Sequence, residues 1–233
     1  MKTPTTLLLG ALLPLVVCGA AKPADDCLEK PEQTFVCDVE DLRPTQLSVG
    51  MSEVKSKEAE LSKKPAEKLE AYKSTHPEPV VRGPEGALYI IDHHHLARAL
   101  SDMGVKQTFC YVAGDLSNLS GQDFFDEMTK RNWLFLEDNT GAKKEAGDLP
   151  LRVSGLQDDP YRSLAGEVRD AGGFGKTCEP FAEFRWADFF REQIGQDLLT
   201  SDHDQALSEA KSAAGSPKAC KLKLPGFEGA PCP

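Results

Sequence analysis

Beyond its first residues, the chain lacks any apolar stretch near the 20 or so residues that a membrane-spanning helix needs. It also lacks internal repeats, and its basic residues form no run longer than a few positions. With 27 Lys and Arg against 37 Asp and Glu, its formal net charge is −10, whereas DNA-binding surfaces usually carry a basic stripe. We therefore expect no membrane span and no extended DNA-binding surface, although a locally basic pocket remains compatible with cutting nucleic acid or binding a nucleotide.

The N-terminal 21 residues have the composition of a secretory signal peptide. Lys2 precedes an apolar run from Leu7 to Val17, and small residues follow at positions 19–21. A lipoprotein signal at Cys18 is disfavoured, because Val17 stands where a small residue is normally needed. We therefore predict a signal peptide over residues 1–21 and a secreted or periplasmic mature protein.

The cysteines contain no C-x-x-C pair, which argues against a redox motif or a zinc site. Six cysteines in an exported chain predict disulfides, for which sequence alone allows fifteen full pairings. The local pairs Cys27–Cys37 and Cys220–Cys232 are the expected ones, and Cys110 is equally consistent with a buried free thiol. The cysteines that follow the signal peptide are Cys27, Cys37, Cys110, Cys178, Cys220 and Cys232.

Composition divides the mature chain into three parts. Residues 22–44 are polar and contain proline, which predicts a loop-rich arm tied by disulfides. Residues 45–215 are long enough for one domain, with a core over 45–115 and a helical extension over 116–215. Residues 216–233 are expected to form a proline-containing tail.

The stretch GALYIIDHHHLARALSDMG, residues 86–104, is the most informative part of the chain. Leu88–Ile91 is apolar and typical of a strand, and Asp92 is a good helix N-cap. His93–Met103 has the spacing of a helix, which Gly104 ends. The pattern predicts a strand, a cap and a helix in direct succession.

The three consecutive histidines of this stretch point in different directions on a helix. His94 and Arg98, four residues apart, share one face, whereas His95 points elsewhere, so His93–His95 cannot together ligate one metal ion. Asp92, His94 and Arg98 instead surround a helix N-terminus, which favours an anion such as phosphate or carboxylate. The alternative is a polar helix start with solvated or capping imidazoles, because Asp92 itself repels an anion.

Several motifs of this sequence occur in the same order in a known family. LYIIDHHHLARAL resembles the strand-to-helix motif of the ParB/sulfiredoxin superfamily, and most closely that of its ParB-like nuclease branch. The resemblance covers roughly residues 45–200. The other matching segments are VGMSEV at Val49–Val54, the turn at Pro79–Pro84, DPYRSLA at Asp159–Ala165 and WADFFR at Trp186–Arg191.

The resemblance implies an α+β fold, with a small mixed sheet of ParB/sulfiredoxin type and a helical C-terminal subdomain. It also implies a nuclease or phosphodiesterase that acts on nucleic acid or on a phosphate-containing small molecule. Sulfiredoxin-like repair of peroxiredoxins is not expected, because histidine replaces the motif cysteine. Partition-type DNA binding is not expected either, because the chain is acidic and lacks a convincing helix-turn-helix.

The candidate catalytic residues come from the two strand-to-helix junctions. In the resembling family the position of Glu53 faces the central motif, so Glu53 is a candidate general base. Glu53 and Asp92 together are candidate ligands for Mg²⁺ or Mn²⁺. His94 is the candidate general acid or base, and His93 completes the group. A first-turn glutamate favoured by the helix dipole is the structural alternative for Glu53.

The candidate phosphate-binding residues are arginines. Arg98, together with Arg82 or Arg162, offers guanidinium donors for phosphoryl oxygens. Surface positions or structural salt bridges are the alternative for these side chains. Two other functions stay open: a nucleotide-dependent phosphotransferase of the same superfamily, in which His93 replaces a motif glycine, and a non-catalytic binding protein.

The remaining apolar patterns predict further strands and helices, among which Trp186 is expected to pack in the core. The expected strands are Gln46–Val49, Pro79–Arg82 and Val105–Ala113, and the expected helices are Met51–Lys63, Pro65–Tyr72, Gln122–Trp133, one starting at Pro160 with Asp159 as its cap, Phe181–Ile194 and Asp204–Ala214.

Overall fold

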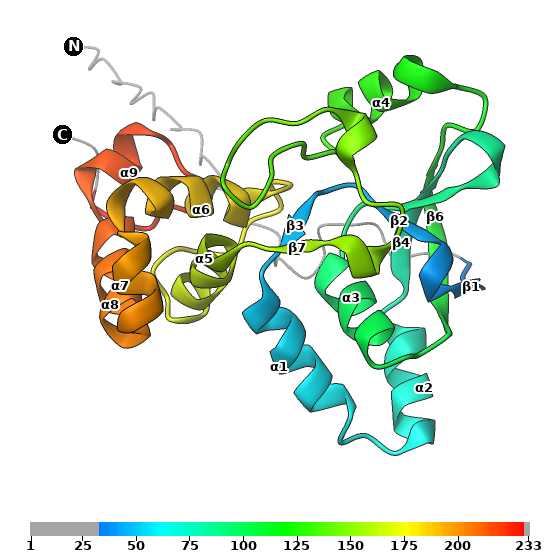
Figure 1. Ribbon diagram of the computed structural model, residues 1–233, viewed down its shortest axis with the longest axis horizontal. Helices are drawn as coiled ribbons and strands as arrows, with labels where there is room; N and C mark the ends of the chain where they lie inside the picture. The colour runs from blue at the N-terminus through cyan, green and yellow to red at the C-terminus, as the bar shows by residue number, and fades with distance from the viewer. Residues whose placement is uncertain (1–32, 231–233) are drawn as a thin grey trace, which may run out of the picture.

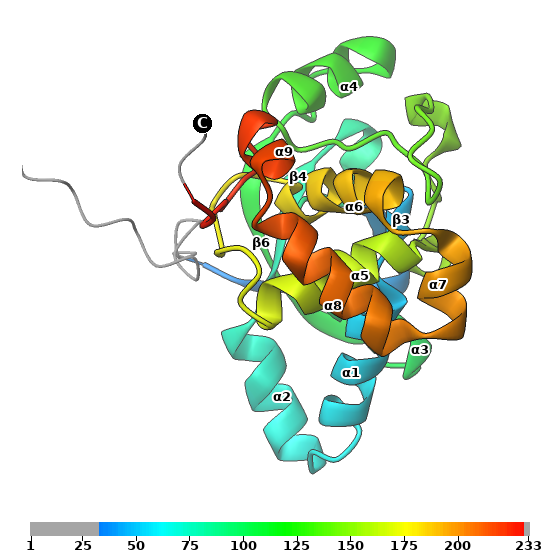
Figure 2. The ribbon, with the colours of Figure 1, turned by 90° about the vertical axis from the view of Figure 1, so that its left-hand side faces the viewer.

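The computed structural model describes residues 33–230. The chain forms a sheet lobe, residues 33–158, and a helical lobe, residues 159–230, which lie side by side (Figure 1). Viewed from the helical lobe, α6, α5 and α8 lie in front of the sheet lobe (Figure 2). The site described below lies between these two lobes.

The sheet lobe is built on a mixed five-stranded sheet with the order β1-β6-β4-β5-β2. Its outer pair β1/β6 and its inner pair β4/β5 are antiparallel, whereas β4/β6 and β2/β5 are parallel. A separate parallel pair, β3 with β7, joins the start of α1 to the start of α5. The strands are β1 Phe35–Asp38, β2 Leu42–Pro44, β3 Ser48–Val49, β4 Glu78–Arg82, β5 Leu88–Ile90, β6 Gln107–Asp115 and β7 Gln157–Asp158.

Helices cover this sheet and supply part of its core. In α3, Leu96, Ala97 and Leu100 are buried on one face, as the helical spacing of this stretch requires. The α-helices of the lobe are α1 Met51–Leu61, α2 Ala66–Thr75, α3 His94–Asp102 and α4 Gly121–Lys130, and its 3-10 turns are η2 Val39–Asp41, η3 Pro84–Gly86, η4 Ala146–Asp148 and η5 Val153–Gly155. A mixed sheet with these helices confirms the predicted α+β class.

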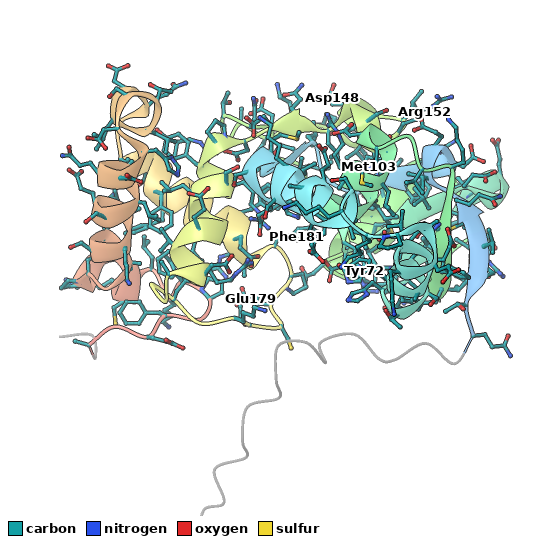
Figure 3. The ribbon with its side chains drawn as sticks, turned by 90° about the horizontal axis from the view of Figure 1, so that it is seen from below. Tyr72, Met103, Asp148, Arg152, Glu179 and Phe181 are labelled. Atoms are coloured by element: carbon teal, nitrogen blue, oxygen red, sulfur yellow. A yellow bond between two sulfur atoms is a disulfide. The ribbon has the colours of Figure 1, made fainter. Side chains whose placement is uncertain are left out.

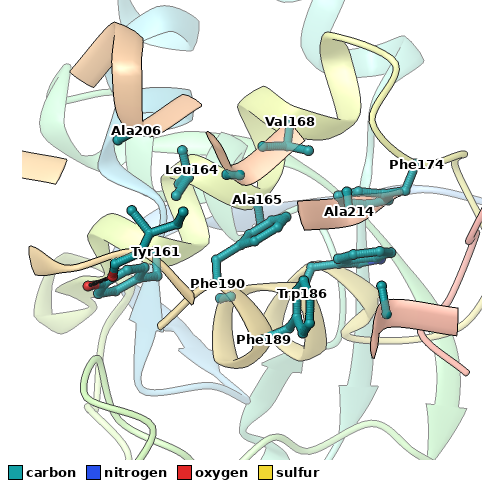
Figure 4. Packing of buried hydrophobic residues seen from close by; sticks show 14 of the residues in the cluster. Tyr161, Leu164, Ala165, Val168, Phe174, Trp186, Phe189, Phe190, Ala206 and Ala214 are labelled. Atoms are coloured by element: carbon teal, nitrogen blue, oxygen red, sulfur yellow. Dashed lines mark hydrogen bonds between the residues drawn. The ribbon is translucent and has the colours of Figure 1, made fainter. Parts of the chain in front are cut away.

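The helical lobe has its own apolar core, in which residues from α5, α6 and α8 interlock (Figure 4). Trp186 is fully buried, stacks on Phe174 with 4.3 Å between the ring centroids, and donates from Nε1 to the carbonyl oxygen of Pro225. Its predicted packing role is therefore confirmed. The helices are α5 Pro160–Asp170, α6 Ala182–Gln193, α7 Gln196–Ser201, α8 His203–Ala214 and α9 Pro217–Lys221.

The start of α5 shows how local sequence positions the helix that faces the site. The Asp159 side chain accepts hydrogen bonds from the backbone N–H groups of Tyr161 and Arg162, and Pro160 occupies the first helical position. The predicted cap is confirmed. Arg191 of α6 donates to the other oxygen of Asp159, so the same carboxylate also ties α6 to α5.

Two expectations for the ends of the chain are wrong. Residues 35–44 are not a polar arm, because β1, η2 and β2 belong to the sheet, and Val39 and Leu42 are fully buried in its core. Strands of three or four residues are too short for an alternating pattern to stand out in the sequence. Near the other end, α9 is a helix whose Ala219 packs into the helical core.

The disulfide expectations are also corrected. Cys37 is bonded to Cys110, with 6.0 Å between the Cα atoms, because β1 lies antiparallel to β6 and brings the two cysteines together. Cys110 is therefore not a free thiol, and the Cys27–Cys37 pair is excluded. Cys178 and Cys220 are disulfide-bonded as well.

Three predictions concern residues outside the described part of the chain. They are the signal peptide over residues 1–21, the remainder of the polar arm, and the Cys220–Cys232 pair, of which Cys232 is not described. Within residues 33–230, no helix is both long and apolar enough to cross a membrane.

Candidate active site

A pocket of about 340 Å³ opens between the two lobes. The sheet lobe contributes the residues that follow β5 and α4, and the helical lobe contributes α5, the start of α6 and the segment between them. Figure 3 shows Glu179 and Phe181 of that segment at the junction of the lobes. The chemically notable lining residues are Asp92, His94, His95, Asn132, Trp133, Arg162, Arg169, Lys176, Phe181 and Glu183.

One wall of the pocket is formed by side chains of an ion cluster that crosses from lobe to lobe, and the carboxylate at its centre, Glu53, lies behind that wall. We call this ion cluster the Glu53 cluster, and it consists of Glu53, His95, Arg162, Arg169 and Glu183. Oε2 of Glu53 accepts a hydrogen bond from Nη1 of Arg162 at 2.7 Å and lies 2.9 Å from Nε2 of His95. Oε1 of Glu53 accepts from Nη2 of Arg169 at 3.0 Å, and Nη1 of Arg169 donates to Glu183.

Backbone positions explain why these side chains meet. Glu53 lies in the first turn of α1, while Arg162 and Arg169 lie on α5, which packs against α1. Between the two arginines, Gly166 lets the carboxylate approach the helix, because a Cβ atom there would lie 2.9 Å from Cδ of Glu53. The spacing of four and then three residues places all three positions on one face of α5.

The charges of this cluster are mutually stabilised. Burial acts to raise the pKa of Glu53, but the charges of Arg162, His95 and Arg169 outweigh it and hold that pKa well below its usual range. The pKa of Glu183 is lowered in the same way, since Arg162 and Arg169 again outweigh burial. Both carboxyl groups are therefore ionised at neutral pH.

The structure gives His94 and His95 different environments. His94 is buried, and its Nε2 accepts a hydrogen bond from the backbone N–H of Thr45 at 3.2 Å. Burial, with smaller contributions from neighbouring positive charges, lowers the pKa of His94 to about 3, so this imidazole is neutral at physiological pH. The side chain of His95 is 21% exposed and lines the pocket beside Glu53. The helical spacing predicted that His95 points away from the face of His94 and Arg98. In the structure, His95 is nevertheless better placed for proton transfer than His94.

The helix start itself differs from the expected one. α3 begins at His94, and its N-cap is His93 in a left-handed conformation with φ of 60°. Asp92 precedes the cap, and its Oδ1 accepts from the backbone N–H of His93 at 2.7 Å. The prediction of Asp92 as N-cap is therefore wrong by one residue, and His93 lies outside the helix. Asp92 still lines the pocket.

His93 faces a second carboxyl group, that of Glu78. We call these two residues, Glu78 and His93, the Glu78 pair. Nδ1 of His93 lies 3.7 Å from Oε2 of Glu78. Glu78 is fully buried at the start of β4, and neither of its oxygens has a hydrogen-bond partner among the described residues. Burial, reinforced by the charge of Asp92, holds the pKa of Glu78 well above its usual range. Glu78 was not among the predicted site residues. A glutamate directly before the apolar residues of a strand was the sequence feature that could have indicated a buried carboxyl group.

Of the three predicted phosphate-binding arginines, the structure brings only Arg162 to the pocket. Arg98 binds Asp102 on its own helix through Nε and donates from Nη1 to the carbonyl oxygen of Leu156 at 2.6 Å. Arg82 is about half exposed and lies 3.8 Å from Asp115. Arg169 lines the pocket instead of Arg98 and Arg82. Its spacing of seven residues from Arg162 on one helix was the sequence feature that could have indicated this position.

The residues present do not fit the predicted Mg²⁺ or Mn²⁺ site. Both oxygens of Glu53 already contact cationic side chains, and a metal ion in that position would face the positive charges of Arg162 and Arg169. Asp92 takes no part in the Glu53 cluster. Across residues 33–230, no group of three or more His, Cys, Asp or Glu residues is arranged to hold a metal ion.

Comparison with known proteins identifies the family. Residues 35–192 match the family model described as "Putative ParB-like nuclease". The crystal structure of protein Atu1540 from Agrobacterium tumefaciens is similar to this chain, with a TM-score of 0.77 and 40% sequence identity. The similarity covers 85% of this chain and 99% of the other. No curated protein matches. The family model matches more than half of the chain, and the predicted motifs and the sheet agree with it. The chain therefore belongs to the ParB-like nuclease family.

Proposed function

We propose that the pocket between the lobes binds a phosphodiester and hydrolyses it, as a nuclease or phosphodiesterase would. The single observation that carries this proposal is the placement of a partly exposed imidazole, His95, in one pocket with two guanidinium groups, Arg162 and Arg169. An acid–base group beside fixed positive charge is the minimum that phosphoryl chemistry needs. Membership of the ParB-like nuclease family supports the same reaction class.

The proposed roles follow from the contacts. His95, oriented by Glu53, takes a proton from a water molecule whose oxygen attacks phosphorus, and returns that proton to the leaving oxygen as the ester bond breaks. Arg162 is buried, and its Nε has no hydrogen-bond partner among the described residues. A phosphate in the pocket would lie beside the Arg162 side chain, and guanidinium groups are strong donors to phosphate oxygens.

Charge balance favours a diester over a polyphosphate. The charges of Arg162 and Arg169 are already matched by those of Glu53 and Glu183, and among the other lining residues Lys176 adds one positive charge while Asp92 and Glu179 add two negative ones. A phosphodiester carries a single negative charge, whereas a nucleoside triphosphate brings several, which this pocket does not balance. The alternative of a nucleotide-dependent phosphotransferase is therefore the weaker one.

The proposed location of the reaction is outside the cytoplasm. Disulfides persist mainly in oxidising compartments, and the Cys37–Cys110 bond crosslinks two strands of the sheet. Together with the predicted signal peptide, this bond supports a secreted or periplasmic enzyme. Its substrate would then be extracellular nucleic acid or a small phosphate-containing molecule.

The test is hydrolysis by the oxidised protein of a single-stranded oligonucleotide and of bis(p-nitrophenyl) phosphate, with p-nitrophenyl phosphate as the monoester comparison. We expect diester cleavage, and a loss on the order of 10²-fold or more in His95→Asn. The matched control is His203→Asn, because His203 contacts Glu167 on the surface of the helical lobe. Equal activity in His95→Asn and wild type would contradict the proposal, as would binding without any cleavage, which would favour a non-catalytic binding protein.

A further inference from the structure

The aromatic side chains of the pocket are not explained by phosphate chemistry. Trp133 lines it from the sheet lobe, directly after α4, and Phe181 and Phe184 line it from the helical lobe. Phe184 stacks on Phe135, with 4.5 Å between ring centroids, and Phe181 lies 5.3 Å from the same ring. Aromatic surface thus borders the pocket on both lobes, next to the Glu53 cluster.

Trp133 is held in place by its neighbours. Its benzo edge lies against the backbone of β6 at Gly114, where a Cβ atom would come within 2.6 Å of Cη2 of the ring. The guanidinium carbon of Arg131 lies 5.1 Å from the ring centroid, and the backbone N–H of Trp133 donates to the carbonyl oxygen of Met128. A fixed, partly buried indole is suited to stack against a flat ligand.

The size and charge of the pocket limit that ligand. Its volume of about 340 Å³ is near the lower end of the roughly 300–1,000 Å³ that small-molecule sites occupy. A duplex cannot enter such a space, and the overall charge of −10 gives no extended surface for its backbone. One flat base with its sugar and phosphodiester matches the combination of aromatic side chains and guanidinium groups in the lining.

We infer that the pocket takes a single unpaired nucleotide unit, with its base against Trp133 and its phosphodiester at Arg162 and Arg169. The exposed side chain of Asn132, also in the lining, offers amide donors and an acceptor to the edge of the base. This inference rests on the proposed phosphodiester site and narrows its substrate class. Single strands and dinucleotides are then substrates, and duplex is not.

The experiment follows tryptophan fluorescence during titration with a dinucleoside monophosphate. The chain has two tryptophans, and Trp186 is fully buried in the helical core, so a change of emission on binding reports Trp133. We expect quenching with the dinucleotide and none with dimethyl phosphate, which has the diester but no base. Equal responses to both ligands, or none to either, would overturn the inference.

The matched variants are Trp133→Leu, Trp133→Phe and Tyr72→Leu. The last removes an aromatic ring from α2, where it stacks on His76, outside the pocket. Affinity for the dinucleotide should fall roughly 5- to 100-fold in Trp133→Leu, recover largely in Trp133→Phe, and stay unchanged in Tyr72→Leu. Unfolding temperatures of all three establish that the variants are folded.

The outcomes separate this inference from the proposed function. If Trp133→Leu cleaves and binds as wild type does, or if duplex is cleaved as fast as single strand, the inference fails while the hydrolase stands. If the dinucleotide binds through Trp133 but no diester is cleaved, the hydrolase fails and the nucleotide subsite stands.

Discussion

The Glu53 cluster and the Glu78 pair present two glutamates with opposite electrostatics, the first partly buried and the second fully buried. Glu53 contacts two guanidinium groups and an imidazole, and its pKa is far below the usual range. Glu78 has only an imidazole at 3.7 Å, and burial raises its pKa. Burial alone therefore does not decide the state of a carboxyl group, because the number of cations within hydrogen-bond distance does.

The two glutamates also differ in what they connect. Glu53 reaches from α1 of the sheet lobe to α5 of the helical lobe, so its charge links the lobes at the edge of the pocket. Glu78 stays within the sheet lobe, between β4 and the start of α3. The first glutamate is tied to the proposed chemistry, whereas the second affects the pH dependence of stability.

The largest effect should come from Glu53→Gln, which leaves Arg162 and Arg169 without their shared carboxylate. Because the cluster is mostly buried, we expect a loss of about 2–3 kcal/mol in the free energy of unfolding, measured by urea denaturation at pH 7. The control is Glu60→Gln on the exposed side of α1, where pairs with Lys57 and Lys64 contribute less than about 1 kcal/mol. Similar losses in the two variants would show that the Glu53 cluster is not structural.

A pH-dependent effect is expected from Glu78→Gln. The folded protein keeps a proton on Glu78 that the unfolded chain releases above its ordinary pKa of 4.5. The contribution of Glu78 to the free energy of unfolding is therefore fully present below about pH 4.5. It falls as pH rises toward the raised pKa, by up to about 1.4 kcal/mol per pH unit. Glu78→Gln should remove this fall, whereas Glu85→Gln at an exposed turn should not. Parallel stability–pH curves for wild type and Glu78→Gln would contradict the assignment.

The smallest effect on stability is expected at Gly166. A substitution there separates the cost of close packing against Glu53 from the gain in helix propensity. In wild type, Gly166→Ala places Cβ against a carboxylate that two arginines hold, so we expect a destabilisation of about 1 kcal/mol. In a Glu53→Ala background the obstacle is gone, and the same change should stabilise by about 0.5–1 kcal/mol, because alanine favours the helix. Thermal unfolding of the four proteins gives both values, and an equal effect in both backgrounds would refute the close approach.

Much of the fold was predictable from sequence, for physical reasons that the elements show. The helix around Leu96 and Leu100 and the capped start of α5 at Asp159 follow from spacing and from local hydrogen bonds. The short strands β1 and β2 were not predictable, because their position depends on pairing with β6 and β5, far along the chain. The same holds for the Cys37–Cys110 bond.

The site was predictable only in part. Glu53, Asp92 and Arg162 were named, and the structure places the first and third in direct contact. The sequence did not indicate that His94 would be buried against Thr45 while His95 would lie beside Glu53, because both contacts depend on how α3 packs against other elements. Arg169 shares a helix face with Arg162, which its spacing could have indicated, whereas Glu183 and Trp133 join the pocket through tertiary packing, which no local pattern records.

The most direct test of the central claim is a double-mutant cycle on diester hydrolysis with Glu53→Gln, His95→Asn and the combined variant, assayed where all three are folded. If Glu53 acts by positioning His95, removing both should reduce the rate hardly more than removing His95 alone, because residues that work as one unit lose their effect together. Losses that multiply in the combined variant would contradict the account and separate the interlobe carboxylate from the chemistry.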